Sequence, residues 1–403
     1  MNAPSGRSQS AVSGRAPRVL AVVGTRPEAI KMAPVLAALQ ASGETESRLV
    51  LTGQHSDLLD QALAAVRLTA DYDLKLMRDG QTLYDVAHGC LDGLRNVVQD
   101  FRPDMVLVQG DTATVFFASL VAFFEKVRVG HVEAGLRSGD KWAPFPEEIL
   151  RRLTDTLSDL YFAPTVGAAQ RLREEGASPD QIYVTGNTVV DALLEVVATD
   201  RESEDPSLAA ILDDRESRLV LLTAHRRESF GAPLEEVFGA VRKLVEEHPD
   251  VELLYPVHPN PKVLDPAKRL LGNHPRIHLV DPLPYLDLVT AVKHSHLILT
   301  DSGGIQEEAP TFGTPVLVLR DVTERPEGVE AGVARLVGTD ETTILKEARA
   351  LLAGSGAAPG ERISGQEAVP NPYGDGRAGE RIADIVLSTL TGSHRSTSDW
   401  EPQ

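Results

Sequence analysis

Residues Arg18 to Glu28 read RVLAVVGTRPE, and this stretch indicates the fold class. Arg18 to Val23 form a short apolar run that predicts a buried strand, and the Gly-Thr-Arg-Pro-Glu that follows predicts a turn into a helix. Pro27 suits the first turn of that helix, where its missing N–H costs nothing. We expect the helix to continue to about Gln40. Strand, turn and helix in this order begin an α/β unit with parallel strands.

The same alternation continues along the chain and then restarts. Further strands are expected at Met105–Gln109, Val127–Val132, Leu160–Ala163, Arg218–Thr223, Glu252–Val257, Ile277–Val280, His296–Thr300 and Pro315–Leu319. Short apolar strands separated by helices indicate parallel sheets covered on both faces. The predicted fold class is α/β, with two Rossmann-like doubly wound domains facing a cleft. We place the N-terminal domain at residues 17–186 and the C-terminal domain at residues 187–374.

Composition limits the possible partners. The 403 residues include 40 basic and 59 acidic side chains, which give a net charge of −19. This charge argues against binding to nucleic acid or to an anionic membrane, and no apolar run approaches the ~20 residues of a membrane span. The single cysteine, Cys90, favours a reducing compartment, so we expect a cytoplasmic protein. Residues 1–16 and 392–403 have the composition of a disordered leader and a disordered tail.

Charged residues follow several of the predicted strands. Arg26 and Lys31 come after the first strand, and Asp111 and Glu133 come after two others. His225 begins a His-Arg-Arg-Glu run after a further strand, which suggests anion binding in so acidic a chain. Because ligands of open α/β sheets bind beyond the carboxyl ends of the strands, we expect these groups to line a site in the cleft.

A phosphate seat is expected where the strand at His296–Thr300 runs into Ser302, Gly303 and Gly304. Glycines let a ligand approach the backbone closely, and the N-terminus of the following helix offers free N–H groups. Glu308, one turn later, is placed to accept hydrogen bonds from ribose hydroxyls. The alternative is a glycine-rich turn with ordinary acids at a helix start. The cations expected to hold phosphate, each of which alone also fits a surface ion pair, are Arg26, Lys31 and Arg325.

Three carboxylates near strand ends are candidates for acid/base chemistry: Asp111, Glu133 and Glu147. Acids that lie close together raise one another's pKa, which makes them useful near neutral pH. Asp111 fits a helix N-cap equally well, and Glu147 fits an ordinary acid of a first helical turn. Metal signals are weak, because the acidic pair in Asp71-Tyr72-Asp73 arises easily by chance in such a chain. We therefore expect no metal.

These segments together make the chain resemble the non-hydrolysing UDP-N-acetylglucosamine 2-epimerases. The matching segments are Gly24–Glu28, Gln109–Thr112, His131–Arg137, Pro144–Glu148, His225–Gly231, His258–Pro261, Thr300–Pro310 and Arg320–Glu327. They run in order from about Arg18 to Leu390. The resemblance implies a glycosyltransferase-B arrangement of the two domains. It also implies a C-terminal helix, at residues 375–391, that crosses back to the N-terminal domain.

The resemblance further implies a reaction that inverts C2 of UDP-N-acetylglucosamine. UDP leaves by anti elimination to give a 2-acetamidoglucal, and it adds back after C2 is reprotonated on the other face. No cofactor is implied, the partner is a UDP-N-acetylhexosamine, and the assembly is a homodimer. Asp111, Glu133 and Glu147 become the acid/base candidates, and His225 would lie near the diphosphate. The residues that would hold UDP are Arg26, Lys31, Ser302, Gly303, Gly304, Glu308 and Arg325.

Two departures from the family pattern bear on ligand binding. Gln54 and His55 match a second UDP-N-acetylglucosamine site of regulated members, but Asp57 and Gly80 stand where glutamine and arginine are typical. Losing a cation and gaining an acid should weaken diphosphate binding, so we expect weak or absent allosteric activation. Leu288 stands where an aromatic residue often packs near the uracil.

Three other functions remain in competition. A hydrolysing epimerase would release UDP and free N-acetylmannosamine from the same fold. A retaining glycosyltransferase would use the same UDP seat, but sugar transfer has no C2 proton for Asp111, Glu133 or Glu147 to remove. A non-catalytic UDP-sugar sensor would have no need of the three acids.

Overall fold

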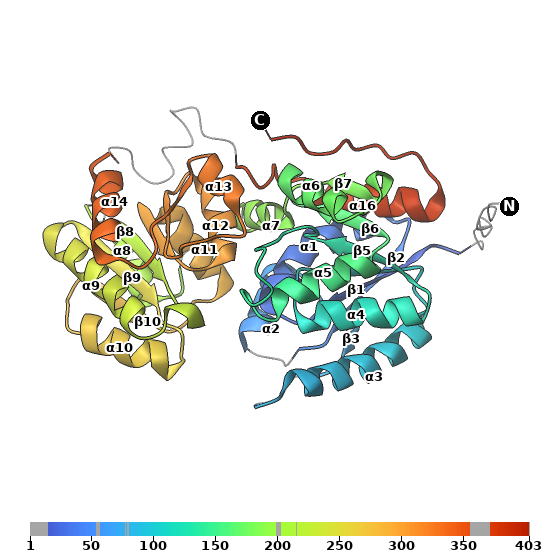
Figure 1. Ribbon diagram of the computed structural model, residues 1–403, viewed down its shortest axis with the longest axis horizontal. Helices are drawn as coiled ribbons and strands as arrows, with labels where there is room; N and C mark the ends of the chain where they lie inside the picture. The colour runs from blue at the N-terminus through green and yellow to red at the C-terminus, as the bar shows by residue number, and fades with distance from the viewer. Residues whose placement is uncertain are drawn as a thin grey trace.

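Two parallel sheets organise the computed structural model, which describes residues 15–53, 57–76, 78, 80–198, 203–214, 216–354 and 371–402 (Figure 1). The first sheet has seven strands in the order β3-β2-β1-β4-β5-β6-β7, and the second has six in the order β10-β9-β8-β11-β12-β13. Both orders reverse beside the first strand of the sheet, as in a Rossmann fold. The expected fold class, two doubly wound α/β domains, is therefore confirmed.

The strands agree with the sequence where the sequence predicts them. The first sheet contains β1 (Arg18–Val23), β2 (Glu46–Leu51), β3 (Tyr72–Asp73), β4 (Met105–Gln109), β5 (Arg128–Val132), β6 (Leu160–Ala163) and β7 (Ile182–Val184). The second contains β8 (Arg218–Thr223), β9 (Val251–Pro256), β10 (Ile277–Val280), β11 (Leu297–Thr300), β12 (Val316–Val318) and β13 (Ala334–Leu336). Strands β2, β3, β7 and β13 were not predicted.

Helices cover both faces of each sheet. The N-terminal half has α1 (Arg26–Ser42), α2 (Asp57–Ala65), α3 (Leu83–Phe101), α4 (Ala113–Phe124), α5 (Glu147–Leu157) and α6 (Val166–Glu174). The remainder has α7 (Thr188–Val197), α8 (Pro206–Asp213), α9 (Ala232–Glu247), α10 (Pro261–Leu271), α11 (Tyr285–His294), α12 (Gly303–Glu308), α13 (Pro326–Glu330), α14 (Glu341–Gly354) and α16 (Ala378–Thr391).

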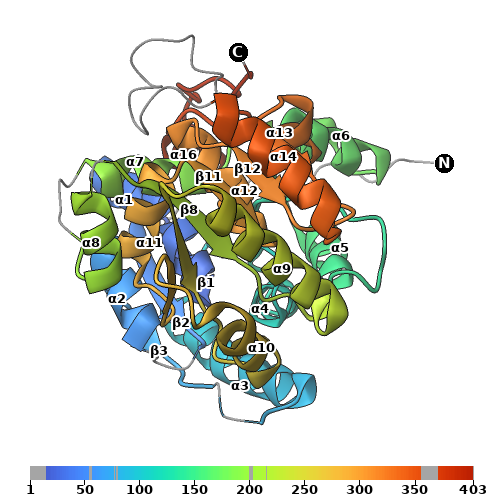
Figure 2. The same ribbon diagram turned by 90° about the vertical axis from the view of Figure 1, so that its left-hand side faces the viewer.

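The alternation of side chains along β1 and β8 divides each domain into two core layers. Val19, Ala21 and Val23 pack with α1 and α16, whereas Leu20 and Val22 pack with α3 and α4 on the other face. In the same way, one face of β8 packs with α9, α10 and α14, and the opposite face packs with α8 and α11 (Figure 2). Strands buried on both faces read as continuous apolar runs, which is why the sequence identified them.

The chain passes between the two domains twice, and the two crossings touch. The first crossing follows β7 at Gly186 and Asn187, and the second lies at Tyr373 and Gly374. The N–H of Asn187 donates to the carbonyl of Tyr373 at 2.7 Å. Gly186 has a φ of 82°, and a Cβ built on it would lie 3.3 Å from the Cα of Gly374. Glycine thus gives the paired crossings both their turn and their close approach.

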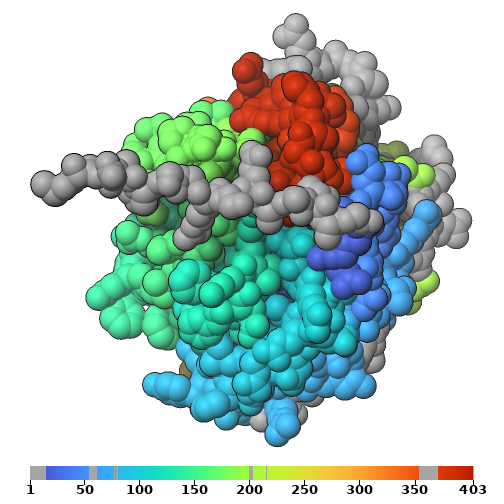
Figure 3. All heavy atoms as spheres, turned by 90° about the vertical axis from the view of Figure 1, so that its right-hand side faces the viewer, coloured from blue at the N-terminus to red at the C-terminus, as the bar shows by residue number. Residues whose placement is uncertain are grey.

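Helix α16 returns to the N-terminal domain, where it packs against α1. Ile382, Ile385 and Val386 are buried in the same core as β1. Gly379 lies directly against α1, since a Cβ there would be 2.7 Å from the carbonyl carbon of Pro34. In Figure 3 the red C-terminal residues lie beside the blue N-terminal ones.

The residues after α16 form a packed segment without helix or strand, in contrast to the disordered tail expected at residues 392–403. Trp400 is only 6% exposed, and its N–H donates to the carbonyl of Val184 in β7 at 2.7 Å. A carboxylate oxygen of Asp399 accepts from the N–H of Val184 at 3.1 Å. The tail therefore covers the free edge of β7, and one tryptophan among small polar residues anchors it. Residues 1–14 of the expected leader lie outside the described residues.

Candidate active site

A cavity of about 600 Å³ lies between the carboxyl ends of the two sheets. Its volume is within the range of ~300–1,000 Å³ usual for small-molecule sites. Residues that follow β1, β4 and β5 line it on one side, and residues that follow β8, β9 and β11 line it on the other. The cavity thus lies where the strand-end residues predicted a site, and its role as the active site stays a prediction. The predicted site residues that line it are Arg26, Lys31, Asp111, Glu133, Glu147, His225, Ser302, Gly303, Gly304, Glu308 and Arg325.

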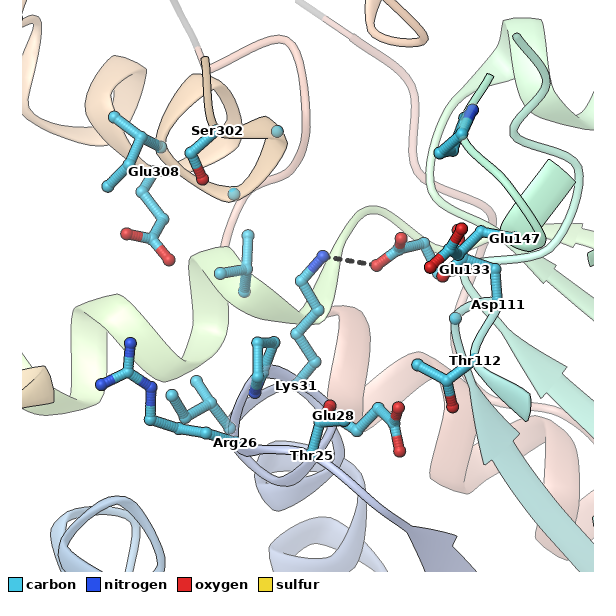
Figure 4. A pocket seen from close by; sticks show the side chains of 18 of the residues that line it. Thr25, Arg26, Glu28, Lys31, Asp111, Thr112, Glu133, Glu147, Ser302 and Glu308 are labelled. Atoms are coloured by element: carbon cyan, nitrogen blue, oxygen red, sulfur yellow. Dashed lines mark hydrogen bonds and ion pairs between the residues drawn. The ribbon is translucent and has the colours of Figure 1, made fainter. Parts of the chain in front are cut away.

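The three candidate carboxylates gather at one end of this cavity, from β4, β5 and the start of α5 (Figure 4). Arg151 of α5 joins two of them: one guanidinium nitrogen lies 2.5 Å from Asp111 Oδ2, and the other donates to the carbonyl of Glu133 at 2.7 Å. Glu147 differs, because burial, together with the charge of Asp111, raises its pKa above the ordinary value. Neighbouring carboxylates in unlike environments are suited to opposite roles, one as proton acceptor and one as donor.

The backbone conformation and the side-chain contacts of Glu133 are unusual for a residue in a loop. Its backbone has a φ of 68°, a left-handed conformation that side chains other than glycine seldom adopt and that often occurs at functional sites. Its Oε2 accepts from Lys31 at 2.5 Å and from Gln109 at 2.7 Å. Burial acts to raise the pKa of Glu133, but Lys31 and Arg151 outweigh it and lower the pKa to about 2. Glu133 is therefore ionised at neutral pH.

Lys31 is buried and its ammonium group is shared between the two domains. Besides Glu133 of the N-terminal domain, Nζ donates to Oε2 of Glu307, in α12 of the C-terminal domain, at 2.8 Å. The second oxygen of Glu307 accepts from Arg325 Nε at 2.7 Å. Arg325 also donates to Glu324 at 2.6 Å. The sequence suggested Lys31 and Arg325 as free phosphate ligands, and the structure instead places both within a network of carboxylates.

The opposite end of the cavity has the features expected of a nucleotide seat. Ser302, Gly303 and Gly304 line it where α12 begins, and a Cβ at Gly303 would lie only 2.4 Å from the Arg325 guanidinium. Glu308 is 8% exposed, and its Oε2 has no hydrogen-bond partner among the described residues. Burial, with a contribution from Glu307, raises the pKa of Glu308 to about 7.

Arg26 and His225 line the cavity between these two ends. Arg26 reaches across the cleft, and its guanidinium lies 3.5 Å from the carbonyl of Leu283. The ring of His225 is 43% exposed and stacks on His258 with centroids 5.6 Å apart and planes 6° from parallel. Asp301 supports this loop, since its Oδ2 accepts from the backbone N–H of His225 at 2.6 Å. Both predicted residues are therefore available to a ligand.

Several residues of the site escaped the sequence analysis. Arg151 and Glu307 belong to the carboxylate network described above, and only their tertiary partners reveal them. Glu28 was quoted in the first motif without a role. It is 3% exposed, accepts from the N–H of Gly24 at 2.6 Å, and has its pKa raised to about 7 by burial. A buried histidine, His131, lies 2.8 Å from the carbonyl of Gly110, next to Asp111, and so supports that turn.

Other predicted positions stand apart from the cavity or beyond description. Gln54 and His55 fall outside the described residues, so the predicted second nucleotide site stays a prediction. Asp71 accepts from a backbone N–H at 2.9 Å, and Asp73 accepts from another at 3.2 Å, which are structural roles. In the part of the chain that is described, no group of three or more His, Cys, Asp or Glu is arranged to hold a metal ion. Across the same residues, no helix is long and apolar enough to cross a membrane.

Known proteins are similar to this chain in sequence and in architecture. A family model for UDP-N-acetylglucosamine 2-epimerase matches residues 37–387. The UDP-N-acetylglucosamine 2-epimerase of Bacillus subtilis (strain 168) is 48% identical over 371 residues, which are 92% of this chain and 95% of that one.

Two solved structures extend the comparison to three dimensions. The S. aureus MnaA–UDP co-structure is 44% identical with a TM-score of 0.86, and the match covers 96% of this chain and 100% of that one. The UDP-GlcNAc 2-epimerase from Neisseria meningitidis bound to UDP-GlcNAc is 41% identical with a TM-score of 0.83, and the match covers 93% and 100%.

Proposed function

The chain belongs to the UDP-N-acetylglucosamine 2-epimerase family, and on that premise we propose that it interconverts UDP-N-acetylglucosamine and UDP-N-acetylmannosamine without hydrolysis. One observation supports this proposal most directly. Asp111, Glu133 and Glu147 converge at one end of a cavity whose other end holds a glycine-lined helix start and Glu308, whose Oε2 has no partner among the described residues (Figure 4). This arrangement supports a reaction in which acid/base groups of one domain act on a sugar whose nucleotide is held by the other domain.

The UDP moiety is proposed to bind along the C-terminal domain. The backbone at Ser302, Gly303 and Gly304 faces the diphosphate, and Arg26 and Arg325 supply positive charge to it. The Oε2 of Glu308 accepts from the ribose hydroxyls, which satisfies a buried oxygen that has no partner in the described part of the chain. Leu288 lines the same part of the cavity, where an apolar side chain can pack on the uracil.

The sugar is proposed to lie between the carboxylates, where a C2 proton is removed as the C1–O bond to UDP breaks. Asp111 and Glu133, both held by Arg151, are the candidates to accept that proton. Glu147, whose pKa is raised, is suited to deliver a proton to the other face of C2. UDP then adds back to C1 of the 2-acetamidoglucal. His225 lies beside the cleft, where the leaving diphosphate gathers charge.

The glucal intermediate must stay in the cleft until UDP returns. The paired crossings at Gly186 and Gly374 are suited to a hinge between the domains, because glycine tolerates large changes in backbone angles. Closure around the ligand would exclude water, which favours re-addition of UDP over hydrolysis.

A second copy of the chain is proposed to cover α4, whose sequence ATVFFASLVAFF is apolar all round. Its C-terminal end leaves Phe123 57% and Phe124 64% exposed. Apolar surface of this kind on a helix typically marks an interface. Light scattering should give a dimer for the native chain and a monomer for the variant with Phe123→Asp and Phe124→Asp.

The cytoplasmic location also stays a proposal, for which the buried thiol of Cys90 is the support.

The test is to incubate the protein with UDP-N-acetylglucosamine in D₂O and follow the mixture by proton NMR, with Asp111→Asn as the comparison. We expect a mixture of intact gluco and manno UDP-sugars with deuterium at C2, and no turnover by the variant. Accumulation of UDP with free N-acetylmannosamine would identify a hydrolysing epimerase instead. An unchanged spectrum would refute epimerisation and would direct the next test to transfer onto acceptor sugars.

A further inference from the structure

Glu307 is a fully buried carboxylate that no part of the proposed mechanism uses. It is 1% exposed and does not line the cavity, although its neighbours Lys31, Glu133 and Arg325 all do. Its two oxygens bond to cations on opposite sides, Lys31 at 2.8 Å and Arg325 at 2.7 Å. A carboxylate with this placement cannot touch a substrate directly, so any effect on the reaction must pass through the groups that it holds.

The contact to Lys31 joins the two domains. Lys31 belongs to α1, Glu307 belongs to α12, and 276 residues of chain separate them. On the N-terminal side the same ammonium group holds Glu133 Oε2 at 2.5 Å. The backbone of Glu133 is fixed independently, because its N–H donates to the carbonyl of Phe162 at 3.0 Å. The side chain of Glu133 is therefore held by Gln109, by the more distant Arg151, and by a lysine whose other partner is in the opposite domain.

Because Lys31 pairs with both Glu133 and Glu307, the electrostatic environment of each carboxylate depends on the other. With Glu307 in place, Lys31 neutralises Glu133 only in part, and the charge of Glu307 adds to the proton affinity of Glu133. The other charged groups that face Glu133 are Arg151 of α5 and Arg325 of the segment before α13. Arg325 comes from the same domain as Glu307 and acts on Glu133 in the opposite sense. The contact that distinguishes Glu307 is therefore its hold on Lys31 across the cleft.

We propose that Glu307 is a positioning residue, which acts through Lys31 to fix the side chain of Glu133 from across the cleft. This inference rests on the proposed epimerase function. It goes beyond that function by assigning to the C-terminal domain control over an acid/base group of the N-terminal domain. It also explains why Lys31 is a buried lysine with two carboxylate partners and not an exposed phosphate ligand.

The test compares the variants Glu307→Gln, Glu307→Asp and Glu327→Gln in the D₂O epimerisation assay. Glu327 is the matched control, because it also bonds across the domains, to Thr165 at 2.6 Å, but lies outside the cavity wall. We expect Glu307→Gln to lower kcat on the order of 10- to 100-fold, as for groups that support a site residue, with little change in KM. Glu307→Asp should recover part of the loss, and Glu327→Gln should match the native chain.

A double-mutant cycle separates positioning from a general loss of structure. In a Glu133→Gln background, Glu307→Gln should lower the remaining rate by less than about threefold, because its effect passes through Glu133. The inference would be overturned if Glu307→Gln lowered kcat by the same factor in the native and Glu133→Gln backgrounds, or if Glu327→Gln lowered kcat as much as Glu307→Gln. Turnover by the native chain would still support the epimerase proposal in either case. If Glu307→Gln fails to fold, Glu307→Asp carries the same cycle.

Discussion

Glu308 offers a test of the nucleotide seat through pH. The residue is 8% exposed, one of its carboxylate oxygens has no partner within the described ranges, and burial raises its pKa to about 7. If ribose hydroxyls donate to this group, the ligand binds the ionised form. Affinity should then rise with pH up to about 7 and level off above it. At pH 5, about two units below that pKa, binding should be roughly 100-fold weaker than at pH 9, which is about 2.7 kcal/mol.

Calorimetric titration measures this directly, with Glu308→Gln as the comparison. The variant should lose the charge-assisted hydrogen bonds, worth about 1.5–3 kcal/mol, at pH 8.5. It should also lose the pH dependence that Glu308 causes. Because the terminal phosphate of UDP itself takes a proton near pH ~6, uridine serves as a second ligand without that group. Near pH 6, binding should release protons in the native chain and not in the variant. Parallel pH curves for the two proteins with uridine would refute the assignment of Glu308 to the ribose.

Three further predictions concern stability. Burial raises the pKa of Glu28 from 4.5 to about 7, so ionisation of this group costs stability as pH rises through that interval. In urea unfolding, Glu28→Gln should raise the free energy of unfolding by about 3 kcal/mol at pH 8.5 and by little at pH 4. A difference that does not depend on pH would contradict this reasoning. In thermal melts, Trp400→Ala should lower the free energy of unfolding by about 3–5 kcal/mol. Trp142 is 65% exposed, so Trp142→Ala should change the free energy of unfolding little. Equal effects of the two substitutions would show that Trp400 does not anchor the tail. In an isolated helix, Gly379→Ala would gain about 1 kcal/mol of helix propensity. In this protein the added Cβ would lie 2.7 Å from the carbonyl of Pro34, so we expect a lower melting temperature. A higher melting temperature would refute the close packing of α16 on α1.

The sequence predicted all the central strands except β2, but it missed three of the four edge strands, β3, β7 and β13. Strands such as β1 and β8 are buried on both faces and read as unbroken apolar runs. The unpredicted β3, with two residues, and β7, with three, carry too little sequence for a pattern. They exist because a neighbouring strand supplies their hydrogen bonds.

The site shows a similar division. Residues after strand ends were predictable, because parallel strands bring their carboxyl ends to one edge. The ion-pair partners of these residues were not predictable, because partners such as Lys31 and Glu307 lie 276 positions apart in the sequence. Trp400 was missed for the same reason, because nothing in its neighbourhood of small polar residues indicates the edge of β7.

The placement of α16 and the tail has a consequence for biosynthesis. The N-terminal domain contains the first strand of the chain, yet α16 and Trp400, near the other end, complete its core and its sheet edge. A ribosome adds ~5–20 residues each second, so the face of α1 and the edge of β7 wait roughly ten seconds or more while the C-terminal domain is made. Exposed strand edges and apolar helix faces favour association with other chains during such an interval. The N-terminal domain is therefore completed only after the C-terminal domain has been made.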